Sequence, residues 1–218
     1  MLENKSSEME KYYAKRALEY EDIYLRPERQ DYIRQSKNLL KEYFNNKYVL
    51  EVACGTGFWT ETISEVSKYI LATDINSEVI EIAKNKVYNC KIDFIQDDSY
   101  ELSRIKEKYD SFFAGFWFSH IPKSKIEIFF NVIHKKTNKN ALIIFMDNLY
   151  VEGKNTPISR FDAEGNSYQI RKLKDNSQHE VLKNFYKENE LKNYFKKYGN
   201  EIEITNKKYY WILKYIKK

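Results

Sequence analysis

From residue 47 to residue 147, the chain alternates short apolar runs with segments in which apolar residues recur every three or four positions. The short runs predict β-strands, and the recurring residues predict amphipathic helices. Such an alternation indicates right-handed crossovers and a parallel sheet covered by helices on both faces. The predicted strands are 48–52, 69–75, 91–96, 110–118 and 141–146, and the predicted helices are 58–66, 77–87 and 123–136.

The segments on either side of this core follow other patterns. Residues 8–44 have helical spacing that is interrupted at Pro27, which predicts two helical stretches. Residues 148–180 are polar and contain turn formers, which predicts a long excursion from the end of a strand rather than another strand–helix unit. A helix and two closing strands with an antiparallel link are expected next, at 188–198, 201–205 and 209–215.

Composition narrows the class of protein. The net charge is +5, but the 37 basic residues are spread among 32 acidic ones, so nucleic acid is not the expected partner. The two cysteines, Cys54 and Cys90, are too few for a disulfide framework and lack metal-ligand spacing. Residues 1–10 lack the apolar core of a signal peptide, and no apolar run is long enough to span a membrane. We therefore expect a cytoplasmic monomer or homodimer without a metal site or a membrane partner.

A glycine turn follows the first predicted strand, with Gly55 and Gly57 in a G-x-G arrangement. A dinucleotide-binding turn has a third glycine, which allows close packing of the helix on the strand, and the N-terminus of that helix meets a pyrophosphate. Thr60 occupies that position here. A G-x-G turn suffices for a nucleoside ligand without a phosphate, such as S-adenosylmethionine (SAM), so the turn favours SAM over NAD.

Acidic residues accompany the first three predicted strands. Asp74 ends the second strand, where a carboxylate accepts hydrogen bonds from the ribose hydroxyls of either NAD or SAM. Glu51 lies inside an apolar strand, which is costly unless backbone donors or a ligand ammonium bind it. Of the pair Asp97-Asp98, Asp98 is the better candidate for the adenine amino group, because Ser99 follows it at an expected helix start.

At this point a family resemblance is evident. The segments V-L-E-V-A-C-G-T-G (49–57), A-T-D-I-N (72–76), Q-D-D-S (96–99) and Y-D-S-F-F-A-G-F-W-F-S-H-I-P (109–122) resemble those of class I SAM-dependent methyltransferases. The match covers residues 8–147 in order and spacing. The segment Y-Y-A-K-R-A-L-E-Y-E (12–21) also looks like the N-terminal helix that covers the cofactor in members acting on small molecules.

The resemblance implies a fold and a division of the chain. The fold is a Rossmann-like three-layer α/β/α sandwich, whose seven-stranded, mostly parallel sheet has an antiparallel last strand. Residues 1–218 then form one domain. Its parts are a helical cap at 1–46, a SAM-binding core at 47–147, a substrate-side excursion at 148–180, and a C-terminal helix with closing strands at 181–218.

The resemblance also assigns cofactor contacts by motif, with SAM as the cofactor. The first acid and its glycine turn hold the methionine end, the acid after the second strand holds the ribose, and the acid after the third holds the adenine. Phe116 lies where family members contact the methionine moiety, and tyrosines of the N-terminal helix cover the ligand. The assigned residues are Glu51, Ala53, Gly55, Gly57, Asp74, Ile75, Asp98, Ser99, Phe116, Tyr13 and Tyr20.

Several of these residues have structural alternatives. Gly55 and Gly57 can serve only a tight turn, Glu51 can belong to a salt bridge, and Asp98 can be a helix N-cap. The aromatic run from Phe112 to Phe118 is more often core than site. The tyrosines near the N-terminus, Tyr12, Tyr13 and Tyr20, are equally consistent with a lid and with a core.

The methyl group of SAM is already activated, so the protein mainly has to align an acceptor and exclude water. A base is needed only for an acceptor that is protonated at the working pH. His120 is the best-placed base after the fourth strand, although a structural role is the favoured alternative. His179 and Asp147 are weaker candidates, and His134 is expected to be solvated.

The excursion is expected to build the acceptor site. Its basic and polar residues suit an anionic or polar acceptor, with a solvated loop as the alternative. The candidates are Asp147, Arg160, Tyr168 and Arg171, with His179 and Lys183 nearby. The run F-x-x-x-F-x-F-S-H-I-P (112–122) also resembles bacterial O-methyltransferases of small metabolites, including one that esterifies a phosphonate. We therefore expect O-methylation of a small molecule in preference to N-methylation, with an RNA methyltransferase or a non-catalytic SAM-binding module as alternatives.

Overall fold

The computed structural model describes residues 2–218, and it describes side chains from residue 8 onward. Its main sheet has seven strands in the order β3-β2-β1-β4-β5-β10-β9. Strands β1 to β5 are parallel, whereas β10 is antiparallel to both of its neighbours. These strands are β1 (Tyr48–Val52), β2 (Tyr69–Asp74), β3 (Lys91–Gln96), β4 (Tyr109–Gly115), β5 (Thr137–Asn148), β9 (Gly199–Asn206) and β10 (Tyr210–Lys217). The predicted sheet, including its antiparallel last strand, is confirmed.

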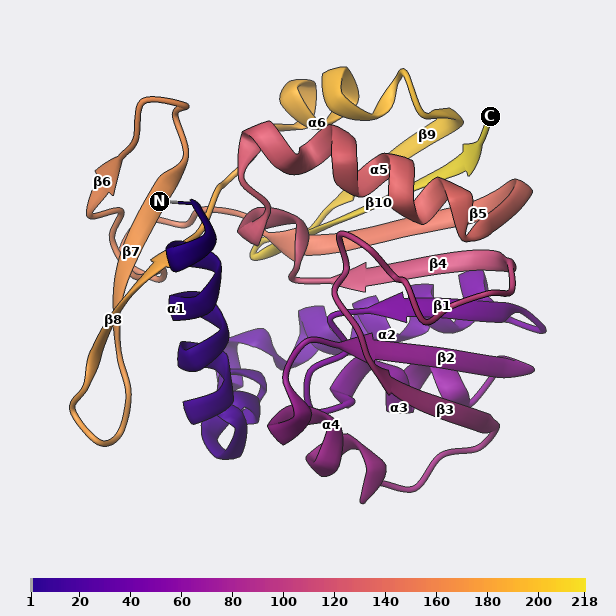
Figure 1. The fold of residues 1–218 in the computed structure, drawn as a ribbon, viewed down its shortest axis with the longest axis horizontal. Helices are drawn as coiled ribbons and strands as arrows, with labels where there is room; N and C mark the ends of the chain where they lie inside the picture. The colour runs from indigo at the N-terminus through magenta and orange to yellow at the C-terminus, as the bar shows by residue number, and fades with distance from the viewer. Residues whose placement is uncertain (1) are drawn as a thin grey trace.

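Helices cover both faces of this sheet and create two cores (Figure 1). Alternate residues of a strand point to opposite faces. On β5, Ile143 and Phe145 accordingly pack with α5 and α6, while Ile144 and Met146 pack on the side of α2 and α3. The helices of this sandwich are α2 (Gln30–Phe44), α3 (Phe58–Ser64), α4 (Ser77–Lys84), α5 (Ile126–Lys135) and α6 (Glu188–Phe195). The three-layer Rossmann-like arrangement follows from this packing.

The excursion after β5 contains a second sheet, which the sequence analysis did not predict. Strands β6 (Arg160–Phe161), β7 (Ser167–Lys172) and β8 (Gln178–Leu182) pair antiparallel in the order β6-β7-β8. The polar residues Ser167 and Gln169 suggested a loop, yet both are buried in β7. Their polar atoms bond to Lys183 O and Thr156 O, respectively, so burial leaves them satisfied.

The N-terminal segment forms the cap over one end of the sheet. Helix α1 (Leu2–Lys15) stands between the small sheet and the carboxyl ends of the parallel strands (Figure 1). Short 3₁₀ helices η1 (Ala17–Tyr24) and η2 (Pro27–Arg29) connect it to α2. None of the helices in the described part of the chain is long and apolar enough to cross a membrane.

Two local expectations were wrong. Strand β4 ends at Gly115 instead of continuing to Phe118, because Phe116 adopts a left-handed backbone (φ 60°) and turns the chain into η3 (Phe118–His120). No helix begins at Ser99. Instead, the Asp98 carboxylate accepts a hydrogen bond from the Tyr100 N–H (2.8 Å), which closes a turn.

Candidate functional site

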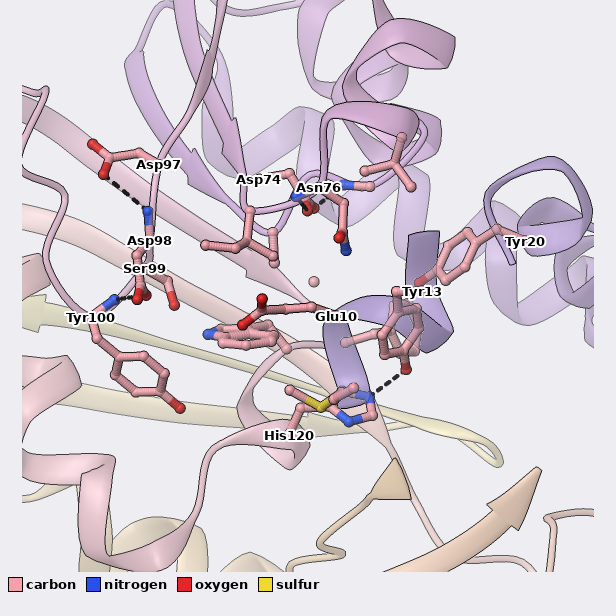
Figure 2. A pocket seen from close by; sticks show the side chains of 18 residues that line it. Glu10, Tyr13, Tyr20, Asp74, Asn76, Asp97, Asp98, Ser99, Tyr100 and His120 are labelled. Atoms are coloured by element: carbon pink, nitrogen blue, oxygen red, sulfur yellow. Dashed lines mark hydrogen bonds between the residues drawn. The ribbon is translucent and has the colours of Figure 1, made fainter. Parts of the chain in front are cut away.

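A pocket lies at the carboxyl ends of β1, β2, β3 and β4, beneath helix α1 (Figure 2). Ligands in open α/β sheets bind at this edge, where the loops that leave parallel strands converge. Residues from the ends of these strands form its floor, and residues from α1 and η1 cover it. The lining residues are Met9, Glu10, Tyr13, Tyr20, Ala53, Gly55, Asp74, Ile75, Asn76, Val79, Asp97, Asp98, Ser99, Tyr100, Gly115, Phe116, Trp117 and His120.

Asp74 is held at the end of β2 by two backbone donors. Its Oδ2 accepts from the Gly55 N–H and its Oδ1 accepts from the Asn76 N–H, each at 2.9 Å. Burial nevertheless raises the pKa of Asp74 to about 6, against the effect of these bonds. Asp74 therefore joins the turn after β1 to the turn after β2, and its remaining lone pairs can accept hydrogen bonds from a diol.

Glu51 lies in β1 beneath the pocket and is 2% exposed. Its Oε2 has no hydrogen-bond partner among the described residues. Burial raises the pKa of Glu51 to about 8, which means that the surroundings do not compensate the charged form. A carboxylate in this condition fits a cationic ligand, since an ammonium group would supply the missing partner. It is not among the residues that line the pocket.

The turn after β1 depends on unusual backbone conformations. Gly55 (φ 57°) and Ala53 (φ 52°) are both in the left-handed region, and both line the pocket. Gly57 (φ 82°) faces away from it, and a Cβ there would overlap the Tyr88 hydroxyl group. Gly55 thus lets the backbone approach a ligand, while Gly57 lets the turn pack against the segment after α4.

The two acids after β3 have different environments. Both carboxylate oxygens of Asp97 accept backbone hydrogen bonds, from Asp98 N–H and Arg104 N–H at 2.9 Å each. Asp98 uses one oxygen for the turn and is less buried. Asp98 is therefore better placed than Asp97 to accept from a ligand at this end of the pocket.

The cap is fastened to the glycine turn through Glu21 of η1. Its Oε1 accepts from the Thr56 hydroxyl (2.6 Å) and from the Lys86 ammonium (2.5 Å). Tyr20, next to Glu21, lines the pocket. These bonds hold the aromatic cap over the turns that follow β1.

A second cavity, of about 610 Å³, opens on the other side of Tyr13 and Phe116. Seven arginine or lysine side chains line it, against two carboxylates, those of Glu19 and Asp22. The basic residues are Arg16, Arg26, Arg29, Lys154, Arg171, Lys172 and Lys183. Among the side chains that the structure describes, only Lys183 of these seven forms an ion pair. We call this space the basic cavity.

Four residues, Tyr13, Tyr20, Phe116 and His120, line both the pocket and the basic cavity. His120 is buried, and its Nδ1 lies 2.6 Å from the Leu182 carbonyl oxygen. Because a carbonyl only accepts, Nδ1 carries the proton, and Nε2 accepts from the Tyr13 hydroxyl at 2.9 Å. Arg171 donates to the same hydroxyl at 3.1 Å. Burial, with Lys183 and Arg171 nearby, holds the pKa of His120 well below its usual range, so it is neutral.

Lys183 lies in a buried polar network on the wall of the basic cavity. Its ammonium donates to the Asp147 carboxylate (2.9 Å) and to the Ser119 hydroxyl (2.6 Å). These two bonds leave one of its three N–H donors for another acceptor. Burial lowers the pKa of Lys183 to about 8 despite the attraction of Asp147. Two of its donors are thus fixed on Asp147 and Ser119, and the residue lines the cavity.

Residues 49–140 match a family model described as a methyltransferase domain. This central part of the chain is therefore similar to a methyltransferase domain. Asp74 in the pocket and the buried Glu51 nearby in β1 are acceptors that suit a ligand with a diol and a cationic group.

Other proteins resemble this chain over longer or shorter stretches. A malonyl-[acyl-carrier protein] O-methyltransferase of Priestia megaterium is 37% identical over 75 residues, which cover 33% of this chain and 27% of that protein. The match therefore spans about a quarter of the relative's length. The solved DhpI–SAH complex superposes with a TM-score of 0.79 at 21% identity, over 95% of this chain and 94% of that one. The PH0226 protein of Pyrococcus horikoshii gives 0.68 at 18% identity, over 88% and 93%.

The predicted cofactor residues gather in the pocket, apart from two. Ala53, Gly55, Asp74, Ile75, Asp98, Ser99, Phe116, Tyr13 and Tyr20 line it, whereas Glu51 lies beneath it and Gly57 supports the turn. Tyr12 belongs to a small core cluster with Leu173 and Val181. Sequence reasoning did not assign eight further lining residues, of which five adjoin assigned residues and were within its reach. These five are Asn76, Asp97, Tyr100, Gly115 and Trp117, and the other three are Met9, Glu10 and Val79.

The predicted acceptor residues are distributed over several places. Arg171 lines the basic cavity, and Asp147 lies under it as the partner of Lys183. Tyr168 lines a smaller cavity between α1 and the small sheet, which His179 also lines. Arg160 pairs with Glu180 (2.5 Å), stacks on the Tyr168 ring and lines none of the three cavities.

His134 was expected to be solvated, and this is wrong. Its Nε2 lies 2.7 Å from the Tyr215 hydroxyl, and burial lowers the pKa of His134 to about 4. The lysines around it in sequence suggested an exposed helix face. The side chain turns instead toward β10, far from the pocket.

Proposed function

We propose that the protein is a methyltransferase that transfers the methyl group of SAM to an oxygen atom of a small anionic molecule. The observation that carries this proposal is the basic cavity, which meets the SAM pocket along Tyr13, Tyr20, Phe116 and His120. A cavity of this size suits a small molecule. Its unpaired cations would repel an acceptor ammonium and attract an anionic oxygen.

SAM supplies a methyl carbon already activated by the sulfonium. The acceptor oxygen forms the new bond to that carbon, and the carbon–sulfur bond breaks with its electron pair going to sulfur. An acceptor that enters as an oxyanion loses no proton in this step. The chain then has to bind the donor, orient the acceptor and exclude water.

The residues divide these tasks by charge. Glu51, Asp74 and Asp98 are the candidates for holding the ammonium, ribose and adenine of SAM. Lys183 and Arg171 are the candidates for holding the acceptor, because both have donors fixed by buried hydrogen bonds near the junction of the two spaces. Charge-assisted bonds from two directions would orient one oxygen toward the donor.

We assign His120 a positioning role. Its Nε2 lone pair accepts the Tyr13 hydroxyl, so this lone pair is already engaged. The bond fixes Tyr13, and through it helix α1, over the donor pocket. An anionic acceptor needs no base, which agrees with a histidine used in this way.

The name of a relative indirectly supports oxygen as the acceptor atom. By its name, the Priestia megaterium relative is an O-methyltransferase that acts on malonyl-[acyl-carrier protein]. Oxygen transfer is therefore a chemistry of at least one related protein, and the basic cavity favours it over transfer to an amine.

The test is a methyl-acceptance screen with labelled SAM and purified protein. The panel contains phosphonates, phosphate monoesters and carboxylates, together with amines and alcohols of matched size. We expect label in methyl esters of the anions, and we expect Asp74→Ala to abolish it. Label only in amines, or in none of the panel and none of a cell-metabolite extract, would refute the proposal.

A further inference from the structure

Arg29 is the least explained charge in the basic cavity. It is 8% exposed, its Nε has no hydrogen-bond partner, and no carboxylate pairs with it among the side chains that the structure describes. Its guanidinium lies over the rings of Tyr209 (5.4 Å) and Tyr210 (5.9 Å) and lines the cavity. A buried, unpaired guanidinium is costly, so a ligand anion would relieve the cost.

Arg29 and Lys183 reach the cavity from opposite faces of the main sheet. Lys183 bonds to Asp147, which pairs in register with Trp211 on the face covered by α5 and α6. Arg29 lies on Tyr210, which pairs with the next residue, Asn148, and packs on the face covered by α2. The two cations therefore lie on opposite faces of the main sheet, where the end of β5 pairs with the start of β10.

The Lys183 side of the basic cavity contacts residues next to the donor pocket. Lys183 bonds to Ser119, the neighbour of His120, and Arg171 bonds to Tyr13, so this side adjoins the junction of the two spaces. Arg26, three residues before Arg29, and Lys154 are exposed and also line the cavity. Neither of them forms an ion pair within the part of the chain that the structure describes.

We infer that the acceptor carries two anionic groups. One is the methylated group, held by Lys183 and Arg171, and the other is held by Arg29, with Arg26 and Lys154 at the rim. The volume of about 610 Å³ accommodates a chain between two such groups and is larger than a single phosphonate or carboxylate requires. The acceptor class is thus a small molecule with acidic groups at both ends.

Because this inference rests on the proposed function, the test measures binding as well as turnover. The probes are 4-phosphonobutyrate and butylphosphonate, which share a phosphonate and a chain and differ in the second anion. Their affinities for the enzyme loaded with demethylated SAM are measured by calorimetry. Methylation of both probes is followed with labelled SAM.

We expect 4-phosphonobutyrate to bind about tenfold to a hundredfold more tightly than butylphosphonate. Arg29→Gln should reduce this ratio to about threefold or less while butylphosphonate keeps its affinity. Arg34→Gln, on the exposed surface of α2, is the matched control and should leave the ratio unchanged. If Arg29→Gln does not fold, the double variant Arg26→Gln/Lys154→Gln tests the same end from exposed positions and should lower the ratio severalfold.

Equal affinities for the two probes would overturn the inference, as would an Arg29→Gln effect that is the same for both. Discrimination in binding without transfer to either probe would leave the second anion site standing and count against the proposed methylation of phosphonates. Methylation of both probes at equal efficiency, with equal affinities, would support the proposed methylation of phosphonates and count against the second anion site.

Discussion

The donor pocket and the basic cavity share a wall and differ in nearly every other respect. The carboxylates that line the pocket are Asp74 at the end of β2, Asp97 and Asp98 directly after β3, and Glu10 of α1, and among the described side chains no arginine or lysine lines it. Basic side chains dominate the cavity, and they come from η2, β7, the chain after β8 and the cap. If the proposed function holds, the comparison teaches that this chain separates its reactants by charge, with a cationic donor in the pocket and an anionic acceptor in the basic cavity.

The largest expected effect is on the acceptor side. We expect Lys183→Met to lower kcat/KM by at least about 100-fold, because the acceptor loses a buried charged donor. SAM affinity, measured by calorimetry, should stay within about threefold. The variant also leaves the Asp147 carboxylate buried without its cation, which can destabilise the fold. The double variant Lys183→Met/Asp147→Asn removes this charge, so a loss of activity that remains in it reflects acceptor binding rather than misfolding. Activity of a folded double variant within threefold of wild type would contradict the assignment.

A complementary effect is expected on the donor side. Asp74→Asn should weaken SAM binding by about 10- to 100-fold, since an amide cannot accept from both the Gly55 and Asn76 amides. Acceptor binding to the loaded enzyme should change little. Asp93→Asn, on the half-exposed start of β3, serves as the control. Unchanged SAM affinity in Asp74→Asn would contradict the assignment of the pocket to the donor.

Glu51 gives a pH-dependent test of the same region. Its pKa is raised from 4.5 to about 8 in the folded, ligand-free protein. The corresponding stability is present below the unfolded pKa and is lost as pH rises through about 8. We therefore expect Glu51→Gln to match wild type at pH 5 and to melt roughly 5 °C higher at pH 8.5 without SAM. In the same variant SAM should bind about tenfold more weakly. Thermal scans of both proteins at both pH values test this. A melting temperature of Glu51→Gln below that of wild type at pH 8.5 would show that neighbouring groups already stabilise the Glu51 carboxylate.

The smallest effect is expected at the shared wall. His120→Asn should lower kcat by less than about tenfold, because it loosens Tyr13 without removing a base. The pH profile of kcat should keep the same limbs as wild type. A loss of more than about 100-fold together with a missing acidic limb would make His120 a base and remove the need for an anionic acceptor.

The two regions also differ in how far the sequence could reveal them. The pocket was predictable because Asp74 and Gly55 belong to turns whose geometry depends on neighbours in the chain. The cavity was not, because Arg29 lies against Tyr209 and Tyr210, which are far away in sequence. The small sheet was missed for the same reason. Its polar residues are buried through bonds to distant backbone groups, and no local pattern records such bonds.

Tyr13 belongs both to the cap over the donor and to the wall of the acceptor cavity. An occupant that holds Arg171 in place also holds the Tyr13 hydroxyl, and with it helix α1, over the spent donor. In the proposed reaction, we therefore expect the departure of the two products to be ordered. The methylated product should leave before demethylated SAM exchanges for a new donor.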